Sequence, residues 1–157
     1  MNVLVTGGAG FIPSHIVDRL LKDGHKVTVL DLWESAESKV HNDNPNFEFI
    51  KGDVLNDDLI AQCMEGKDRV IHMAAVLGTA ETITTFDVEK VCTVNIVGTT
   101  KILKAAKKAG VGRVLIPTTP DVPWINPYKI TKAAVEKLCQ LFSIEYDLDV
   151  VALKLGN

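Results

Sequence analysis

Tyr128 and Lys132 lie four residues apart, a spacing that places both side chains on one face of a helix. An ammonium beside a phenol favours the ionised phenol, so the pair predicts a pKa of Tyr128 below the ordinary value of about 10. A tyrosine tuned in this way takes a proton from a hydroxyl group or returns it. Lys132 also offers N–H groups to a cofactor ribose. On spacing alone, an ordinary solvated helix face is the alternative, and the surrounding elements decide between the two.

A glycine-rich turn near the N-terminus has the form of a phosphate-binding loop. Gly7 permits a tight turn after the apolar stretch 2–6, and Gly10 lets the backbone approach a diphosphate at the start of the helix expected at 11–23. Asp31 follows the next apolar stretch, about 20 residues on, where a ribose-binding carboxylate is expected. A carboxylate repels a 2′-phosphate, and 32–38 contains no lysine or arginine. The turn therefore predicts NAD binding in preference to NADP.

Short β-branched stretches alternate with longer amphipathic ones along the chain, which predicts parallel strands joined by helices. The expected strands are 2–6, 26–30, 47–51, 69–73, 113–117 and 149–153, and the expected helices are 11–23, 56–64, 87–109 and 127–147. The strands are apolar on both faces, as in a sheet covered on both sides. We therefore predict an α/β fold, a doubly wound Rossmann-type parallel sheet with strand order 3-2-1-4-5-6.

Length and composition fit one soluble domain spanning residues 1–157. Hydrophobic residues make up 46% of the chain, charged residues 24%, and the net charge is −3. No basic cluster favours nucleic acid, and no apolar run reaches the length needed to cross a membrane. Cys63, Cys92 and Cys139 show no metal-ligand spacing and are expected to be free thiols in the cytoplasm.

Five segments together resemble the extended branch of the short-chain dehydrogenase/reductase superfamily, the NAD-dependent nucleotide-sugar epimerases and dehydratases. They are the glycine turn 6–12, Gly52-Asp53-Val54, His72-Met73-Ala74-Ala75, Asn95, and the Tyr128/Lys132 pair. The resemblance extends over essentially the whole chain. It implies a cofactor site formed by Gly7, Gly10, Phe11, Ile12, Asp31, Asp53, Val54, Ala74, Ala75, Tyr128 and Lys132.

The same resemblance implies a catalytic set of Thr119, Tyr128 and Lys132. Thr119 would hydrogen-bond the reacting hydroxyl or carbonyl, with Thr118 as the alternative. Asp121 is either an acid, as in the dehydratases, or a turn residue beside Pro120. Asp53 either contacts adenine or caps the helix that begins near residue 56. Asn95 is expected to be structural, and His72 to lie beneath the cofactor.

Three departures from the family pattern concern function. Pro13 stands where the third glycine of the turn is usual, only eight residues separate Thr119 from Tyr128, and the family's C-terminal substrate-binding region is largely absent. The expected function is epimerase/dehydratase-like chemistry on a nucleotide-linked sugar, with a nucleotide sugar as substrate. A catalytically silent NAD-binding module is the alternative, and an NADP-dependent reductase is a further one. A homodimer through helices 87–109 and 127–147 is also expected.

Overall fold

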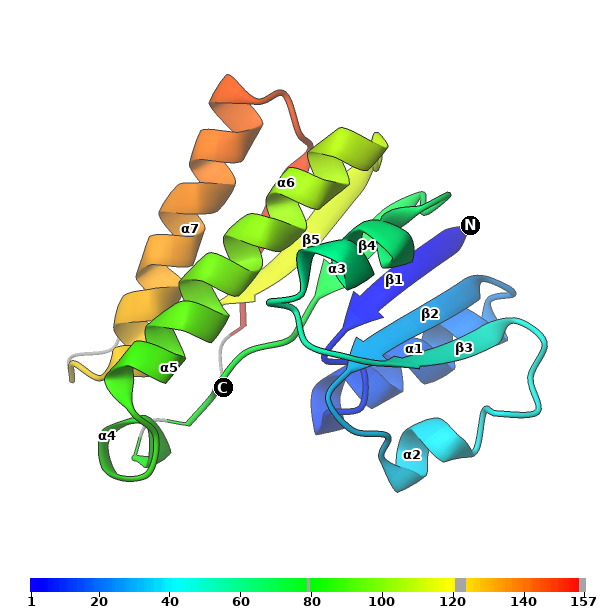
Figure 1. Cartoon of the computed structure of the whole chain (residues 1–157), viewed down its shortest axis with the longest axis horizontal. Coiled ribbons are helices and arrows are strands. Elements are labelled where there is room, and N and C mark those ends of the chain that lie inside the picture. The colour runs from blue at the N-terminus through cyan, green and yellow to red at the C-terminus, as the bar shows by residue number, and fades with distance from the viewer. Residues whose placement is uncertain (79, 121–123, 156–157) are drawn as a thin grey trace.

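The protein is built on a six-stranded parallel sheet, shown in a computed structural model that describes residues 1–78, 80–120 and 124–155 (Figure 1). The strand order is β3-β2-β1-β4-β5-β6, which confirms the predicted order. The strands are β1 (Asn2–Thr6), β2 (Lys26–Asp31), β3 (Phe47–Lys51), β4 (Arg69–His72), β5 (Arg113–Thr118) and β6 (Val150–Lys154). Each lies within one residue of its expected range.

Helices cover both faces of this sheet, and two apolar clusters fill the space between the layers (Figure 1). Alternate residues along β1 point to opposite faces, so Val3 and Val5 pack with Val17 of α1 (Phe11–Lys22). Leu4 joins the larger cluster on the other face. That cluster also receives side chains from α3 (Asp57–Met64), α6 (Thr99–Ala109) and α7 (Pro127–Glu145). This is the doubly wound architecture expected from the sequence.

The helix expected at 87–109 is interrupted in its middle. It consists of α5 (Val88–Cys92), a π-helical segment η1 (Thr93–Gly98) and α6. The hydroxyl groups of Thr99 and Thr100 donate to the carbonyl oxygens of Asn95 and Ile96, at 2.6 and 2.8 Å. The carbonyl oxygens of Asn95 and Ile96, in the wider turns of η1, thus each accept a hydrogen bond from a side chain.

Two short helices were not expected, because each lies in a segment without apolar periodicity. One is α2 (Ala36–Lys39), within the stretch 32–46 that reads as irregular. Ser35 and Ser38 stabilise it through a reciprocal capping box. The other is α4 (Glu81–Thr84). No helix in the part of the chain that the structure describes is long and apolar enough to cross a membrane.

Candidate active site

The residues predicted to bind a cofactor gather at one edge of the sheet, where β1, β2, β3 and β4 end. Backbone hydrogen bonds hold the first residue of the loops after β1, β3 and β4 to a neighbouring strand. Gly7 N–H donates to Leu30 O at 2.8 Å, and Gly52 N–H donates to Asp31 O at 2.8 Å. Met73 N–H donates to Thr6 O at 2.9 Å. The glycine turn, Asp31, Asp53 and Ala74 therefore meet at the carboxyl ends of the strands, where ligands bind in open α/β sheets.

The backbone conformation of residue 7 and the close approach of Ala74 both require glycine at this position. Its φ is +69°, a left-handed conformation that costs a side chain about 1–2 kcal/mol. A Cβ atom built on Gly7 would lie 2.6 Å from the backbone nitrogen of Ala74. Only glycine therefore allows the turn to lie directly against the loop that follows β4.

The N-terminus of α1 points its unpaired N–H groups into the same region. Gly10 is the N-cap, and no side chain caps the helix. The first backbone bond of the helix joins Ser14 N–H to Gly10 O at 3.0 Å, so Phe11 and Ile12 keep N–H groups without an intrahelical acceptor. Pro13 has no N–H to offer. The unpaired N–H groups at the start of α1 form a cradle that suits an anion. This cradle has one backbone donor fewer than a helix with glycine at position 13.

Asp31 is held in place by two backbone donors. One carboxylate oxygen accepts from Ala9 N–H at 3.0 Å, and the other accepts from Leu32 N–H at 2.7 Å. The carboxylate thus links the glycine turn to the end of β2. An ionised carboxylate has about four acceptor positions, so positions remain for a pair of ribose hydroxyls.

Asp53 forms a turn and does not itself cap the following helix. Its carboxylate accepts from Leu55 N–H at 3.0 Å, and the N-cap of α3 is Asn56, which accepts from Leu59 N–H. Val54 is buried in the large apolar cluster. Its side chain lies against Gly98 of η1, where an added Cβ would be 3.1 Å from a Val54 methyl.

The predicted catalytic residues lie at the adjoining end of β5 and in the first turns of α7. Asn126 begins α7 by accepting from Lys129 N–H at 2.8 Å, and Pro127 occupies the first turn, where its missing N–H is not needed. Lys132 donates to Pro117 O at 3.0 Å, which brings the second turn of α7 against β5. Thr118, the last residue of β5, is buried, whereas Thr119 is partly exposed. Asp121 lies outside the described residues.

The predicted pKa of Tyr128 is wrong in direction. Burial raises the pKa of Tyr128, because desolvation disfavours the phenolate. The Lys132 ammonium lies 5.8 Å from the centre of the phenol ring and donates to a carbonyl, so the expected lowering does not arise. Burial also lowers the pKa of Lys132, to about 8.

His72 is buried in a chain of hydrogen bonds beneath the glycine turn. Its Nδ1 lies 2.6 Å from the hydroxyl of Thr6, and its Nε2 lies 3.0 Å from the hydroxyl of Thr99. Because Thr99 donates its own proton to Asn95 O, Nε2 must donate to Thr99 and Nδ1 must accept from Thr6. This arrangement needs a neutral imidazole. Burial, assisted by the charge of Lys132, lowers the pKa of His72 to about 3.

His72 should make the fold sensitive to acid. An unfolded histidine titrates near 6.5, so the unfolded chain binds the extra proton between about pH 6.5 and 3, and stability falls as the pH falls through that window. We expect His72 to account for a loss of about 2 kcal/mol in unfolding free energy between pH 7 and pH 5. Urea titrations of the wild type and of His72→Gln measure it. Equal losses in the two proteins would contradict the assignment.

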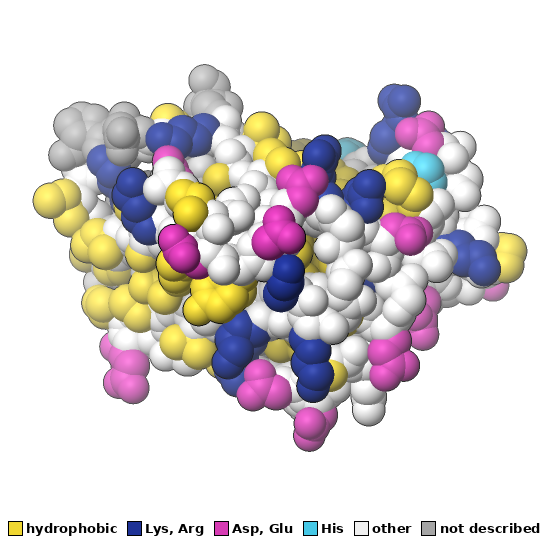
Figure 2. All heavy atoms as spheres, turned by 90° about the horizontal axis from the view of Figure 1, so that it is seen from above, with side chains coloured by type: hydrophobic (Ala, Val, Ile, Leu, Met, Phe, Trp, Pro, Cys, Tyr) yellow, Lys and Arg dark blue, Asp and Glu magenta, His cyan; other side chains and the backbone are white. Residues whose placement is uncertain are grey.

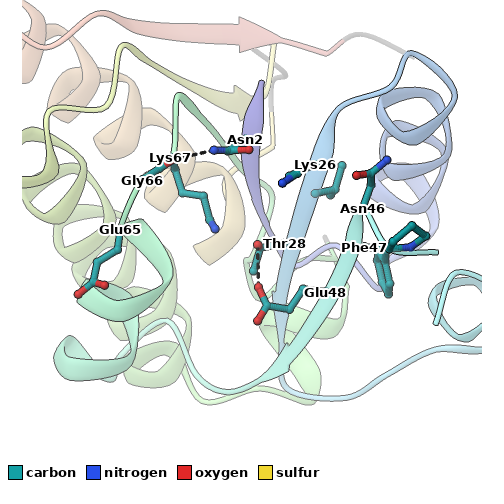
Figure 3. A pocket seen from close by; sticks show the side chains of 11 residues that line it. Asn2, Lys26, Thr28, Asn46, Phe47, Glu48, Glu65, Gly66 and Lys67 are labelled. Carbon is teal, nitrogen blue, oxygen red and sulfur yellow. Dashed lines mark hydrogen bonds between the residues drawn. The ribbon is translucent and has the colours of Figure 1, made fainter. Parts of the chain in front are cut away.

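The hollow shown in Figure 3 is separate from this site. Its walls include Asn2 and Lys26, the first residues of β1 and β2, together with the turn at Gly66 (Figure 3). It therefore opens at the amino ends of the strands, the edge opposite the glycine turn. Within the described residues no group of His, Cys, Asp and Glu side chains has the arrangement of a metal site.

Comparison with known proteins agrees with this geometry. The model of the NAD dependent epimerase/dehydratase family matches residues 3–157. The chain belongs to this family. A UDP-glucose 4-epimerase of Mycolicibacterium smegmatis is 37% identical to this family member, over 100% of this chain and 56% of that protein. The alignment runs over 179 positions, so the relative carries residues within the matched region that this 157-residue chain lacks.

Solved structures of similar proteins show the same fold. The UDP-glucose 4-epimerase of Thermotoga maritima, solved with UDP-glucose, superposes with a TM-score of 0.83 at 30% identity, covering 98% of this chain and 55% of that one. A dTDP-glucose 4,6-dehydratase of Streptomyces venezuelae, solved with NAD, gives a TM-score of 0.87 at 30% identity, covering 97% and 54%. This family member thus spans about half the length of these relatives.

Proposed function

We propose that the chain binds NAD across the carboxyl edge of its sheet. The observation that carries the proposal is the convergence of three features there: the glycine turn against Ala74, the uncapped start of α1, and the anchored carboxylate of Asp31. The α1 cradle suits the diphosphate, and Asp31 suits the adenosine ribose. The 2′-phosphate of NADP would meet the charge of Asp31. Solved relatives with NAD bound support this choice.

The reaction proposed is epimerase- or dehydratase-like chemistry on a nucleotide-linked sugar, with Tyr128 as acid and base. NAD, when bound, supplies the acceptor for a hydride from a sugar carbon. Tyr128 accepts the proton of the reacting hydroxyl and later returns it, and Thr119 hydrogen-bonds the same oxygen. Lys132 keeps two N–H groups beyond its bond to Pro117, which suit a cofactor ribose. Burial opposes ionisation of Tyr128, which favours the protonated phenol before the substrate binds.

The substrate class rests on the relatives. UDP-glucose is bound in the Thermotoga maritima structure, and the Mycolicibacterium smegmatis relative is named for the same sugar nucleotide. We propose that residues 1–157 form one cofactor-binding domain, with much of the family's substrate-binding region outside this sequence. The alternative is a catalytically silent dinucleotide-binding module. Pro13 and the short connection from Thr119 to Tyr128 favour the alternative, whereas the intact Tyr128/Lys132 pair favours catalysis.

Calorimetric titration with NAD and NADP, followed by turnover assays with UDP-, GDP- and dTDP-sugars, tests the proposal. We expect micromolar NAD binding and much weaker NADP binding. Equal affinity for the two cofactors would contradict the role of Asp31, and absence of binding would contradict the cofactor site. NAD binding without conversion of any sugar nucleotide would support the silent module.

Pro13 should limit the affinity for NAD. Replacing it with alanine restores an N–H to the diphosphate cradle and keeps a Cβ, whereas replacing it with glycine also removes that carbon. We expect Pro13→Ala to tighten NAD binding by at least about ten-fold, because a hydrogen bond to a charged group is worth about 1.5–3 kcal/mol. Calorimetry with both variants measures the effect. Unchanged affinity in both would show that the missing donor has no consequence.

We also propose that α5, η1, α6 and α7 form a homodimer interface. Among the apolar residues of these helices, Val91 is fully buried, and Val94 and Leu138 pack against the core. Leu141 is exposed, and α7 adds the exposed side chains of Ile130 and Ile144 on the same helical face. Hydrophobic side chains gather on this side of the molecule (Figure 2).

We call the exposed side chains of Ile130, Leu141 and Ile144 the α7 stripe. A charge introduced into this stripe should therefore shift the protein from dimer to monomer. We expect Ile144→Asp to weaken association at least about ten-fold, because an unpaired carboxylate would be buried. Val40→Asp is the matched control, since Val40 is 74% exposed and Ile144 75%. Val40 lies at the end of α2, far from α7 (Figure 1). Sedimentation measures both, and a wild type that is monomeric at high micromolar concentration would contradict the interface.

The three free thiols support a cytoplasmic location.

A further inference from the structure

The hollow in Figure 3 is lined by polar side chains that the proposed function does not use. Its volume is about 460 Å³, within the range of about 300–1,000 Å³ that small-molecule sites occupy. It lies at the amino ends of β1, β2 and β3, against the turn at Gly66 that joins α3 to β4. The glycine turn of the proposed NAD site is at the opposite edge of the sheet, so a ligand here leaves the cofactor edge free.

One face of β2 changes from apolar to polar as it approaches this hollow. Leu30 belongs to the large apolar cluster, and Thr28 and Lys26 lie on the same face because side chains alternate along a strand. Thr28 is 5% exposed and donates its hydroxyl proton to the Glu48 carboxylate at 3.1 Å. Glu48 is the register partner of Thr28 on β3, so both side chains lie on one face. The buried hydroxyl thus anchors a carboxylate in the wall of the hollow.

The other wall is a turn that β1 holds in place. Asn2 Nδ2 donates to Gly66 O at 3.1 Å, and Asn2 N–H donates to the Asp68 carboxylate at 2.6 Å. Asp68 N–H donates to Asn2 O at 2.8 Å. These three bonds fix the backbone on both sides of Lys67. Figure 3 shows the Lys67 side chain extending from the turn toward β2, whereas the Glu65 carboxylate is directed away.

Two lysine amines that line the hollow are unpaired. In the part of the chain that the structure describes, neither Lys26 nor Lys67 belongs to an ion pair, and neither amine donates a hydrogen bond. Together they offer two positive charges and up to about six N–H donors. Glu48 keeps free acceptor positions beyond its bond to Thr28. The hollow therefore combines two cations with one anchored acceptor.

This combination discriminates between classes of small molecules. A plain anion is attracted by the lysines but repelled by Glu48, and a neutral sugar leaves both ammonium groups without a counter-charge. A phosphate monoester that also carries hydroxyl groups matches both features, because its phosphate accepts from ammonium groups and its hydroxyls donate to a carboxylate. We propose that the hollow binds a sugar phosphate, with the phosphate on Lys26 and Lys67 and hydroxyl groups on Glu48.

Calorimetric titration with glucose 6-phosphate tests the proposal, with glucose, inorganic phosphate and serine in separate titrations. Serine is included because its carboxylate and ammonium groups match the same charges. We expect glucose 6-phosphate to bind at least about ten-fold more tightly than the other three, since glucose and phosphate each match one part of the site and serine fills little of it. Phosphate binding as tight as that of glucose 6-phosphate would describe a simple anion site. Tighter binding of serine would describe a zwitterion site, and either result overturns the proposal.

Each titration is run with and without saturating NAD, because the start of α1 also suits a phosphate. We expect the affinity for glucose 6-phosphate to be the same in both conditions. Binding that disappears when NAD is present would assign the phosphate to the α1 cradle and overturn the proposal. A wild type that does not bind NAD would reject the proposed function, while variants of the hollow would still decide the sugar phosphate site.

Lys26→Gln and Lys67→Gln should each weaken glucose 6-phosphate binding by at least about ten-fold, because each removes a charged donor. Lys104→Gln is the matched control. It removes the same charge from an exposed lysine of α6 that does not line the hollow, and it should keep wild-type affinity. Thermal unfolding reports whether each variant is folded. Wild-type affinity in both hollow variants would contradict the site.

Glu48→Gln tests the acceptor separately. The amide oxygen of glutamine can still accept from Thr28, whereas the negative charge is lost. We therefore expect tighter binding of inorganic phosphate and a smaller preference for glucose 6-phosphate over phosphate. An unchanged preference would show that Glu48 does not contact the sugar, and would reduce the site to one for phosphate alone, against the proposal.

Discussion

Replacing Tyr128 with phenylalanine should abolish hydride transfer while leaving NAD bound. The change removes one hydroxyl from a residue of the proposed catalytic set, and general acid–base groups contribute about 10²–10⁴-fold to rate. We therefore expect at least a 100-fold loss in conversion of the active sugar nucleotide. The affinity for NAD should change by no more than a few-fold, because most proposed contacts come from other elements. Appearance of the reduced nicotinamide in single-turnover mixtures provides the measurement.

The chain offers a matched control for this change. Tyr146 is the only other tyrosine and stacks on Phe142 just beyond the far end of α7, with ring centres 4.7 Å apart. Tyr146→Phe removes the same hydroxyl at a distance from the site and should keep full activity. Conversion that survives Tyr128→Phe, or that falls equally in both variants, would reject Tyr128 as the acid and base.

Gly7→Ala should give the largest loss of stability and of cofactor affinity among single-glycine changes in the turn. The alanine meets the left-handed backbone penalty, and its Cβ would lie 2.6 Å from Ala74 N and 2.7 Å from Ala74 Cα. Those atoms belong to backbone, so the loop after β4 must move. Overpacking of this kind costs about 1–3 kcal/mol in addition to the backbone penalty of about 1–2 kcal/mol. We expect a total near 3 kcal/mol and at least a ten-fold loss of NAD affinity.

Gly24→Ala separates the two contributions. Gly24 has a similar φ of +78°, and an added Cβ there meets nothing within 4 Å. It should therefore show the backbone penalty alone and bind NAD normally. Urea titrations and calorimetry on both variants measure the difference. Equal unfolding free energies for the two would mean that the approach of Gly7 to Ala74 has no energetic consequence.

Much of this molecule follows from short-range patterns. The strands were predicted closely because a run such as Val27 to Leu30, which is apolar on both faces, fits a buried strand and few other elements of an α/β protein. The strand order followed from helical crossovers, and the glycine turn with Asp31 located the cofactor edge.

What the sequence did not reveal depends on contacts between distant residues. The spacing of Tyr128 and Lys132 predicted that they share a helix face. It did not predict that both are buried, or that the Lys132 ammonium donates to Pro117 O. The π-helical turn leaves the apolar pattern of 87–109 almost unchanged, so periodicity could not detect it. The hydrogen bond from Asn95 to Thr131, 36 residues away, becomes visible only when the helices pack.

The strand order also has a consequence for handling the protein. In the described chain β3 and β6 each have one partner, so each leaves a row of unpaired backbone groups on its outer side. Such rows template pairing between molecules, and charged side chains are the usual defence. β3 carries Glu48 and Lys51, but β6 carries only Lys154, beside the exposed Leu153. Of the two outer strands in the described residues, β6 therefore has the weaker charged protection, which rests on Lys154 alone.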